Sequence, residues 1–414
     1  MTNIHESILV IGFNTRPLVY SLYQAGFKVY TVDFFGDIDL FPYVEDSIII
    51  TKRLHMDYQN IKDTYRKFLV DFTLELLEKY PDIDYFLIGS GLDDSLNERR
   101  IIIDEINKKK YSLLSLNNSL KSIQKSRDIR QIYNIVKNKG YSIPKSIIFN
   151  EFNMAHPPLN YPFIMKKKAS SGGINIYKIN NKEQLEYRFR LINKKKENHN
   201  WLIQEYIEGL AISCTVISNG NDSEVISINR QIIGLNFLNS PEEFIYCGNI
   251  VPANISENDK DTAKKISRFL SNHLGLKGIN GFDFVIKNHI PYLMEINPRI
   301  PGSIRASEES LNINLLKLHF DSFFPDKWNL IKKIINSIKI TNFSTKLIYF
   351  APKELSIEHL KKINNLKYIH DKSKPLKNIK KHEPICSILY KDKTFSDSYF
   401  GALKIVDKIK QIIF

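Results

Sequence analysis

The sequence predicts an α/β domain at the N-terminus, then an α+β region, and a small β-rich module at the C-terminus. The α/β domain is indicated by residues 8–33, which contain an apolar segment, a turn, a helical segment and a second apolar segment. A hairpin pattern with strands Phe282–Ile286 and Pro291–Ile296 indicates the second. Strand patterns after Thr341, followed by a terminal helical pattern at Phe395–Ile412, indicate the third.

The N-terminal pattern is that of a βαβ unit. The apolar run that begins at Ile8 reads as a buried strand, Pro17 opens a helix that ends at Gly26, and Lys28–Asp33 form the next strand. The turn after the first strand carries one glycine, Gly12, where a dinucleotide site would carry G-x-G-x-x-G. The pattern therefore argues against a dinucleotide site.

A further strand begins at Phe86 and ends in a loop of small and acidic residues. Open α/β sheets bind ligands outside the carboxyl ends of their strands. Ser90, Gly91 and Asp93 are therefore candidate substrate contacts, and an ordinary strand-to-helix turn is an equally open interpretation.

The next two segments carry candidate phosphate contacts. A helical segment runs from Ser119 to Gly140 and includes Lys125. An apolar strand then ends at Lys166, and small residues follow it. The backbone of such a loop can close over phosphates. The small residues of this loop are Ser170, Ser171, Gly172 and Gly173.

The α+β region is also expected to contain a further hairpin and two helices. Ser213–Ser218 and Glu224–Gln231 are expected to pair across an Asn-Gly turn, with Arg230 near the end of the second strand. Thr262–Leu274 is an amphipathic helix, and a second helix is expected over Glu308–Phe320.

The hairpin after residue 281 gathers oxygen-bearing side chains. Strand alternation places Asp283 on one strand, and Glu295 and Asn297 at the end of the other. Two carboxylates and one amide suit Mg²⁺, which takes oxygen ligands and is usually also coordinated by substrate phosphates. A hairpin with two solvated acids is the alternative interpretation.

Composition narrows the class of protein. The chain has 414 residues, of which 43% are hydrophobic, so it can bury several cores. The net charge of +14 comes from lysines scattered along the chain, so we expect no nucleic-acid partner. No apolar run approaches the roughly 20 residues of a membrane span, and no signal peptide is recognisable. The cysteines Cys214, Cys247 and Cys386 form no framework of disulfide bonds or zinc ligands, and we expect a cytoplasmic protein without a membrane partner.

The segment Asp283, then Glu295-Ile-Asn297-Pro-Arg299, resembles the metal-binding signature of the ATP-grasp superfamily. The strand that ends at Lys166 and its glycine-bearing loop are similar to the strand-lysine and lid of that superfamily, with Lys167 in place of a usual proline. Within the superfamily the chain looks closest to archaeal-type carboligases related to biotin carboxylase, and it is also similar in outline to tyramine–glutamate ligase.

The resemblance implies a division into three parts and a set of site residues. These are an N-terminal pre-ATP-grasp domain over residues 1–115, an ATP-grasp domain of two lobes over 116–325 with a hinge near 204–209, and a C-terminal module over 340–414. Asp283, Glu295 and Asn297 would hold Mg²⁺, with Mn²⁺ as a substitute ion. Lys125 and Lys166 would contact the phosphates.

Other residues take their expected roles from the same resemblance. The lid would be Ser170, Ser171, Gly172 and Gly173, and Arg230 would face the phosphates. Gln204 and Glu205 would contact adenine through their side chains, and Ile207 through its backbone. The usual ribose-binding glutamate is replaced by Ala211, which leaves Glu208 for that role. Arg299, with Lys166, would stabilise the transferring phosphoryl group.

Three functions stay open at this stage. The first is an ATP- and Mg-dependent ligase that activates a small-molecule carboxylate as an acyl phosphate and joins it to an amine. Such a ligase could form a homodimer. The second is a carboxylase like biotin carboxylase, which works through carboxyphosphate. The third is a nucleotide-binding protein without catalysis, which Ala211 and Lys167 would suit and the retained metal ligands argue against.

Overall fold

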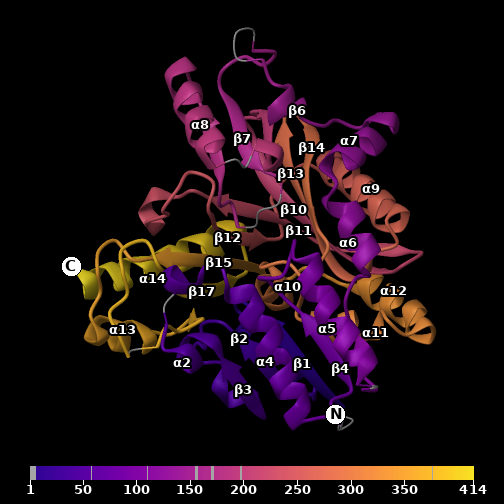
Figure 1. The fold of residues 1–414 in the computed structure, drawn as a ribbon, viewed down its shortest axis with the longest axis vertical. Coiled ribbons are helices and arrows are strands. Elements are labelled where there is room, and N and C mark those ends of the chain that lie inside the picture. The colour runs from indigo at the N-terminus through magenta and orange to yellow at the C-terminus, as the bar shows by residue number, and fades with distance from the viewer. Residues whose placement is uncertain are drawn as a thin grey trace.

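The computed structural model describes residues 6–56, 58–109, 111–153, 157–168, 172–195, 198–374 and 376–414. These residues form three sheets of five, eight and four strands. In Figure 1 the N-terminal five-stranded sheet lies at the bottom, the four-stranded sheet and α8 form a lobe at the top, and the eight-stranded sheet lies between them. Among the described residues, no helix combines the length and apolar character that a membrane span requires.

The N-terminal sheet is parallel and has the strand order β3-β2-β1-β4-β5, which confirms the predicted α/β domain. One face packs against α2, α4 and α5, and the other packs against α1, α11 and α12. The strands are β1 (Ser7–Gly12), β2 (Lys28–Asp33), β3 (Asp46–Ile49), β4 (Tyr85–Ile88) and β5 (Leu114–Ser115). The helices of this domain are α1 (Arg16–Gln24), α2 (Ile50–Leu54), α3 (Tyr58–Ile61), α4 (Tyr65–Lys79) and α5 (Leu96–Lys108).

The strand order reverses between β1 and β4, so the loops after these two strands flank one crevice. The two loops touch, because the backbone N–H of Phe13 donates to the carbonyl oxygen of Ser90 over 2.8 Å. The candidate contacts Ser90, Gly91 and Asp93 therefore lie at the edge where such sheets bind ligands.

The eight-stranded sheet carries the predicted hairpins. Its strand order is β14-β13-β10-β11-β12-β15-β17-β16, and each of its pairs is antiparallel. α7 and α9 pack on its first four strands, and α13 and α14 pack on β12, β15 and β17. The strands are β10 (Leu210–Asn219), β11 (Ser223–Ile233), β12 (Tyr246–Val251), β13 (Lys277–Lys287), β14 (Ile290–Asn297), β15 (Phe343–Phe350), β16 (Ile369–His370) and β17 (Pro384–Asp392). The helices on it are α7 (Ile129–Asn138), α9 (Glu257–His273), α13 (Ile357–Asn364) and α14 (Phe395–Ile413).

The C-terminal strands extend this sheet instead of forming a sheet of their own. β15 pairs with β12, and Gly248 of β12 allows the close approach. A Cβ at Gly248 would lie 2.0 Å from the carbonyl oxygen of Lys346. The β-rich C-terminal segment is therefore present as predicted, and its backbone is hydrogen-bonded to the preceding region.

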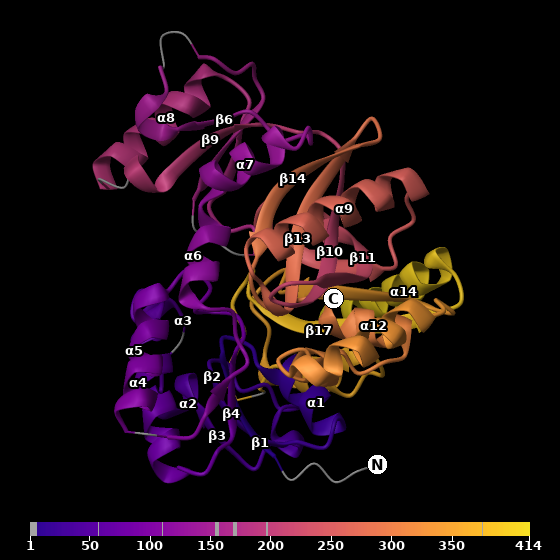
Figure 2. The same cartoon turned by 90° about the vertical axis from the view of Figure 1, so that its right-hand side faces the viewer.

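The upper lobe in Figure 2 is a small antiparallel sheet with the order β6-β9-β7-β8, covered by α8. Its elements are β6 (Ser146–Ile148), β7 (Phe163–Lys167), β8 (Ile176–Ile179), α8 (Lys182–Lys195) and β9 (Trp201–Glu205). α6 (Leu120–Arg127) runs between this lobe and the N-terminal domain (Figure 2).

Two helices that the sequence predicts as continuous are each broken in two. The segment that starts at Ser119 forms α6 and α7, because the Asp128 side chain caps α7 by accepting from the backbone N–H of Gln131 over 3.1 Å. The segment after residue 303 forms α10 (Ile304–Leu311) and α11 (Leu315–Asp321), because Asn312 adopts a left-handed conformation with φ of 54°. α12 (Trp328–Ser337) follows them.

A buried histidine joins the N-terminal domain to the large sheet. His319 on α11 accepts from the backbone N–H of Ile279 over 2.9 Å through Nδ1, and its Nε2 lies 3.0 Å from the carbonyl oxygen of Leu116. This pattern requires the neutral ring with the proton on Nε2. Burial lowers the pKa of His319 to about 4.

We predict that His319 makes the stability of the fold depend on pH. Between about pH 6.5 and pH 4 the unfolded chain binds a proton at this ring that the folded protein excludes, so its contribution is present above pH 6.5 and is lost as the pH falls. The expected loss between pH 7.5 and pH 5 is about 2 kcal/mol. His319→Gln keeps one donor and one acceptor but does not titrate. Thermal melts at both pH values should show a larger drop in wild type than in this variant; equal drops would contradict the assignment.

Candidate active site

The three predicted metal ligands meet on the β13–β14 hairpin. Asp283 pairs with Glu295 across the two strands, and Gly281 pairs with Asn297. The Asn297 amide donates to Oδ2 of Asp283 over 2.8 Å. Gln231 on β11 donates to Oδ1 of the same carboxylate over 2.9 Å. Asp283 lies opposite Glu295 because the strand register shifts between Asp283 and Phe284, so an irregularity in the hairpin, as well as alternation, sets this pairing.

The charges on this hairpin favour a bound cation. Burial, and then the neighbouring charge of Glu295, raise the pKa of Asp283 to about 7. A divalent cation between the two carboxylates would offset both effects. Among the described residues no three His, Cys, Asp or Glu side chains form a group that could hold a metal by themselves. The set of two carboxylates and one amide fits Mg²⁺, which usually takes its other ligands from water and substrate.

Arg127 lies beside these carboxylates, and the sequence analysis did not select it. It is the last residue of α6 and forms ion pairs with Glu295 and with Asp94 of the N-terminal domain. Its Nη2 lies 2.8 Å from Oδ2 of Asp94. Burial alone would lower the pKa of Arg127, but the two carboxylates raise it above its ordinary value. The guanidinium is therefore a fixed positive charge.

The selected basic residue of this helix, Lys125, is exposed. Its role as a phosphate contact stays a prediction, although Arg127 is the residue that faces the carboxylates. The sequence contains a signal for the break between α6 and α7, since Asp128-Ile-Arg-Gln131 has the spacing of a helix N-terminal capping pair.

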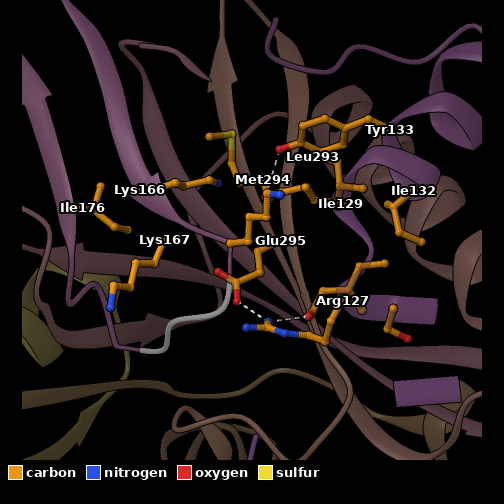
Figure 3. Close-up of a pocket in the computed structure, with 13 residues that line it drawn as sticks. Arg127, Ile129, Ile132, Tyr133, Lys166, Lys167, Ile176, Leu293, Met294 and Glu295 are labelled. Atoms are coloured by element: carbon orange, nitrogen blue, oxygen red, sulfur yellow. Dashed lines mark hydrogen bonds and ion pairs between the residues drawn. The ribbon is translucent and has the colours of Figure 1, made fainter. Parts of the chain in front are cut away.

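An open cleft of about 460 Å³ lies between the small lobe and the large sheet. Figure 3 shows Lys166 of β7 reaching toward β14, with Glu295 and Arg127 on the opposite wall. Burial lowers the pKa of Lys166, and the charge of Glu295 counters this effect. The cleft is lined by Ser126, Arg127, Ile129, Ile132, Tyr133, Lys166, Lys167, Lys168, Ile176, Leu293, Met294, Glu295 and Ile296. Apolar walls with a basic floor suit a ligand that has an apolar ring and an anionic group.

The end of the glycine-bearing loop is fixed on β12. Ser170 and Ser171 lie outside the described residues. The carbonyl oxygen of Gly172 accepts from the backbone N–H of Tyr246 over 3.1 Å. A Cβ at Gly173 would lie 1.8 Å from the carbonyl oxygen of Phe244, so only glycine fits there.

The predicted hinge connects β9 with β10. The Gln204 amide nitrogen donates to Tyr133 over 2.9 Å, and a Glu205 carboxylate oxygen accepts from the backbone N–H of Lys145 over 3.1 Å. Ile207 is buried, and Glu208 is exposed. The adenine roles of Gln204, Glu205 and Ile207, and the ribose role of Glu208, stay predictions.

Strand alternation separates two neighbours on β11. Arg230 is exposed, and its guanidinium lies 5.9 Å from the centre of the Phe395 ring on α14. Gln231 points the other way and reaches Asp283. Gln231, and not Arg230, therefore faces the carboxylates in this structure.

Arg299 lies two residues beyond Asn297 and forms an ion pair with Asp93 of the N-terminal domain. Its Nη1 also donates to the carbonyl oxygen of Ile300 over 3.1 Å. Burial lowers the pKa of Arg299 to about 10, so it is charged at neutral pH. The candidate substrate contact Asp93 is thus a partner of the candidate catalytic arginine.

Sequence comparisons place these residues in a known domain. Residues 127–303, which run from Arg127 to the loop after β14, match the ATP-grasp domain family. An uncharacterised protein of Methanocaldococcus jannaschii is 29% identical over 387 residues, which are 93% of this chain and 88% of that protein. The D-alanine–D-alanine ligase of Flavobacterium psychrophilum is 27% identical over 173 residues, which are 41% of this chain and 51% of the ligase.

Solved structures share the fold over nearly the whole chain. The L-amino acid ligase of Bacillus licheniformis superposes with a TM-score of 0.67 at 17% identity, covering 98% of both chains. The biotin carboxylase domain of the 2-oxoglutarate carboxylase of Hydrogenobacter thermophilus, solved with MgADP and bicarbonate, has a TM-score of 0.70 at 14% identity, covering 98% of this chain and 94% of that one. The fold is therefore that of the ATP-grasp proteins.

We predict that the two described lid glycines differ in their tolerance of alanine. Both have positive φ, 69° at Gly172 and 86° at Gly173, so each alanine adds backbone strain of about 1 kcal/mol. Only Gly173→Ala also forces its Cβ against the carbonyl oxygen of Phe244, because the space at Gly172 is open. Thermal melts should therefore rank Gly173→Ala well below Gly172→Ala. Equal melting temperatures would show that the lid end does not contact β12.

Proposed function

We propose that the chain is an ATP-grasp ligase that activates a carboxylate as an acyl phosphate and joins it to an amine, releasing ADP and phosphate. The observation that carries this proposal is the group of Asp283, Glu295 and Asn297 on one hairpin, of which Glu295 lines the same cleft as Lys166. A binding protein for an uncharged ligand would have no physical need for this group of charges.

The nucleotide would lie in the cleft between the small lobe and the large sheet, with the hinge near 204–209. Asp283, Glu295 and Asn297 would hold Mg²⁺, which neutralises charge on the triphosphate when it is bound. Mn²⁺ would fit the same oxygen ligands. Lys166 would contact the phosphates from the small lobe, with the described lid glycines above them, and Arg127 would add a fixed charge on the opposite wall.

Arg299 would stabilise the phosphoryl group as it moves to the carboxylate. The reaction leaves little covalent work to the protein, so positioned charges supply most of the catalysis. Arg299 suits this role because it is nearly buried and is positively charged at neutral pH. The crevice formed by the loops after β1 and β4 would hold the carboxylate and the amine, with Ser90 and Gly91 as contacts.

A carboxylase that works through carboxyphosphate is the second candidate. The superposition on a biotin carboxylase domain, which includes the C-terminal strands, favours it. ATP turnover that depends on bicarbonate, without any amine or other carboxylate, would select this candidate. Turnover that depends on a carboxylate together with an amine would select the ligase.

We predict ADP and phosphate as the nucleotide products. Purified protein is incubated with MgATP and a panel of carboxylates, amines and bicarbonate, and the products are read by phosphorus NMR. An acyl phosphate route transfers only the γ-phosphoryl group, so AMP and pyrophosphate should be absent. Pyrophosphate in the spectrum would place the protein in an adenylating class, and no turnover across the panel would argue against both enzyme functions.

We predict that the hairpin ligands are required for turnover. Glu295→Ala and Asn297→Ala should each lower kcat by about 100-fold or more, because each removes a ligand that acts on developing charge. Glu257→Ala is the matched control, because Glu257 is exposed and pairs with Lys260 on the surface over 2.6 Å. Calorimetry should show weaker Mg-dependent binding of ADP to the two hairpin variants only. Wild-type turnover in both would remove the metal assignment.

A further inference from the structure

The loop after β4 supplies two adjacent carboxylates to two arginines of the ATP-grasp domain. Asp93 pairs with Arg299, and Asp94 pairs with Arg127. The side chains of Asp93 and Arg299 are 12% and 15% exposed, so water screens this pair little. Arg127 in turn contacts Glu295, and the backbone N–H of Arg299 donates to the carbonyl oxygen of Asn297 over 2.8 Å, so both arginines are tied to the Glu295–Asn297 segment.

We infer that Asp93 and Asp94 are positioning residues for phosphoryl transfer, which set the place of Arg299 and Arg127 beside the metal ligands. This inference rests on the proposed function and extends it to the N-terminal domain. Neither aspartate needs to touch the nucleotide, because each acts through its arginine.

The backbone of this loop is fixed well enough to position charges. The N–H of Gly91 donates to Oδ2 of Asp93 over 2.9 Å, and the Tyr65 hydroxyl donates to the carbonyl oxygen of Gly91 over 3.1 Å. Beneath the loop, Arg99 is 3% exposed and donates through Nε to the carbonyl oxygen of Leu92 over 2.7 Å. The first bond holds the Asp93 carboxylate directly, and the other two hold the backbone just before Asp93 and Asp94.

Arginine side chains are flexible, so Arg127 and Arg299 need carboxylate partners to hold their guanidinium groups in place. A guanidinium between two carboxylates has one low-energy position, whereas Arg127 without Asp94 would be drawn toward Glu295 alone. That shift would strengthen its ion pair with a metal ligand and weaken any contact with a phosphate. Loss of Asp93 would leave Arg299 buried without its carboxylate partner.

The same loop also borders the crevice proposed for the other substrates. Its Ser90 accepts from the backbone of Phe13, and a Cβ at Gly91 would lie 3.0 Å from the Cβ of Phe13. A substrate that binds against the loops after β1 and β4 therefore contacts the backbone that holds the arginines. This arrangement would make transfer depend on an occupied N-terminal crevice.

The test compares Asp93→Asn and Asp94→Asn with a matched control, Asp46→Asn. Asp46 lies in the same domain and pairs with Lys79 over 2.8 Å, away from the two arginines. Each test variant should lower kcat by about tenfold or more while KM for ATP changes by less than about threefold, because positioning acts in the transition state. Asp94→Glu, which keeps the charge, should recover part of the kcat that Asp94→Asn loses.

A double variant shows whether Asp94 acts through Arg127. Asp94→Asn combined with Arg127→Met should have the same kcat as Arg127→Met alone, since the carboxylate has no effect once the guanidinium is gone. The thermal melt of Asp94→Asn should stay near that of Asp46→Asn, because Arg127 keeps Glu295 as a partner. Asp93→Asn should melt lower, because Arg299 loses its carboxylate partner, so kcat is compared at a temperature where every variant is folded.

Three outcomes would overturn the inference. In the first, the kcat values of Asp93→Asn and Asp94→Asn lie within about twofold of that of the control. Another is additive loss in the double variant, and the third is loss of melting temperature and kcat together with no recovery in Asp94→Glu. In all three the wild type still releases ADP, so the proposed function stands. A wild type that releases no ADP overturns the proposed function and this inference together.

Discussion

The structure depends on holding two like charges side by side, those of Asp283 and Glu295. Their proximity and burial raise the pKa of Asp283 to about 7, so the pair needs donors around it. Asn297 and Gln231 each donate to Asp283, and Arg127 pairs with Glu295. These donors come from β14, β11 and α6, so the arrangement exists only when three separate parts of the chain have packed together. A site of this kind stores electrostatic repulsion that a divalent cation can relieve.

The break between α6 and α7 decides where the third donor lies. A continuous helix would have carried Arg127 on a regular helical face, whereas the cap at Asp128 ends α6 with Arg127 as its last residue. From there its guanidinium reaches both Asp94 and Glu295. Asp94 of the N-terminal domain thus pairs with the same guanidinium that pairs with Glu295 of the carboxylate site.

The sequence alone predicted the features that local periodicity controls. Period-two alternation placed Asp283 on one hairpin strand and Glu295 and Asn297 at the end of the other, whereas the pairing of Asp283 with Glu295 also depends on the register shift between Asp283 and Phe284. Local periodicity did not indicate which of two close neighbours faces the carboxylates: Arg127 does so near Lys125, and Gln231 does so beside Arg230. The phosphate contacts of Lys125 and Arg230 stay predictions. Which neighbour faces the site is decided by a bulge, a capped helix break or a neighbouring sheet. These features depend on contacts between residues that are distant in sequence. The extension of the large sheet by β15 depends in the same way on the close approach at Gly248.

The two walls of the cleft are joined at its base through Tyr133 on α7. Its hydroxyl donates to the carbonyl oxygen of Met294 on β14 over 3.1 Å and accepts from the amide of Gln204 on β9 over 2.9 Å. At the other side, the lid end is bonded to β12 through Gly172 and Tyr246. A further link on that side is the ion pair of Lys178 on β8 with Glu243 over 3.7 Å. Because Tyr133 also lines the cleft, a ligand that fills it contacts the residue that holds the lobes together. Tyr133 therefore belongs both to the lining of the cleft and to the hydrogen bonds that join its two sides.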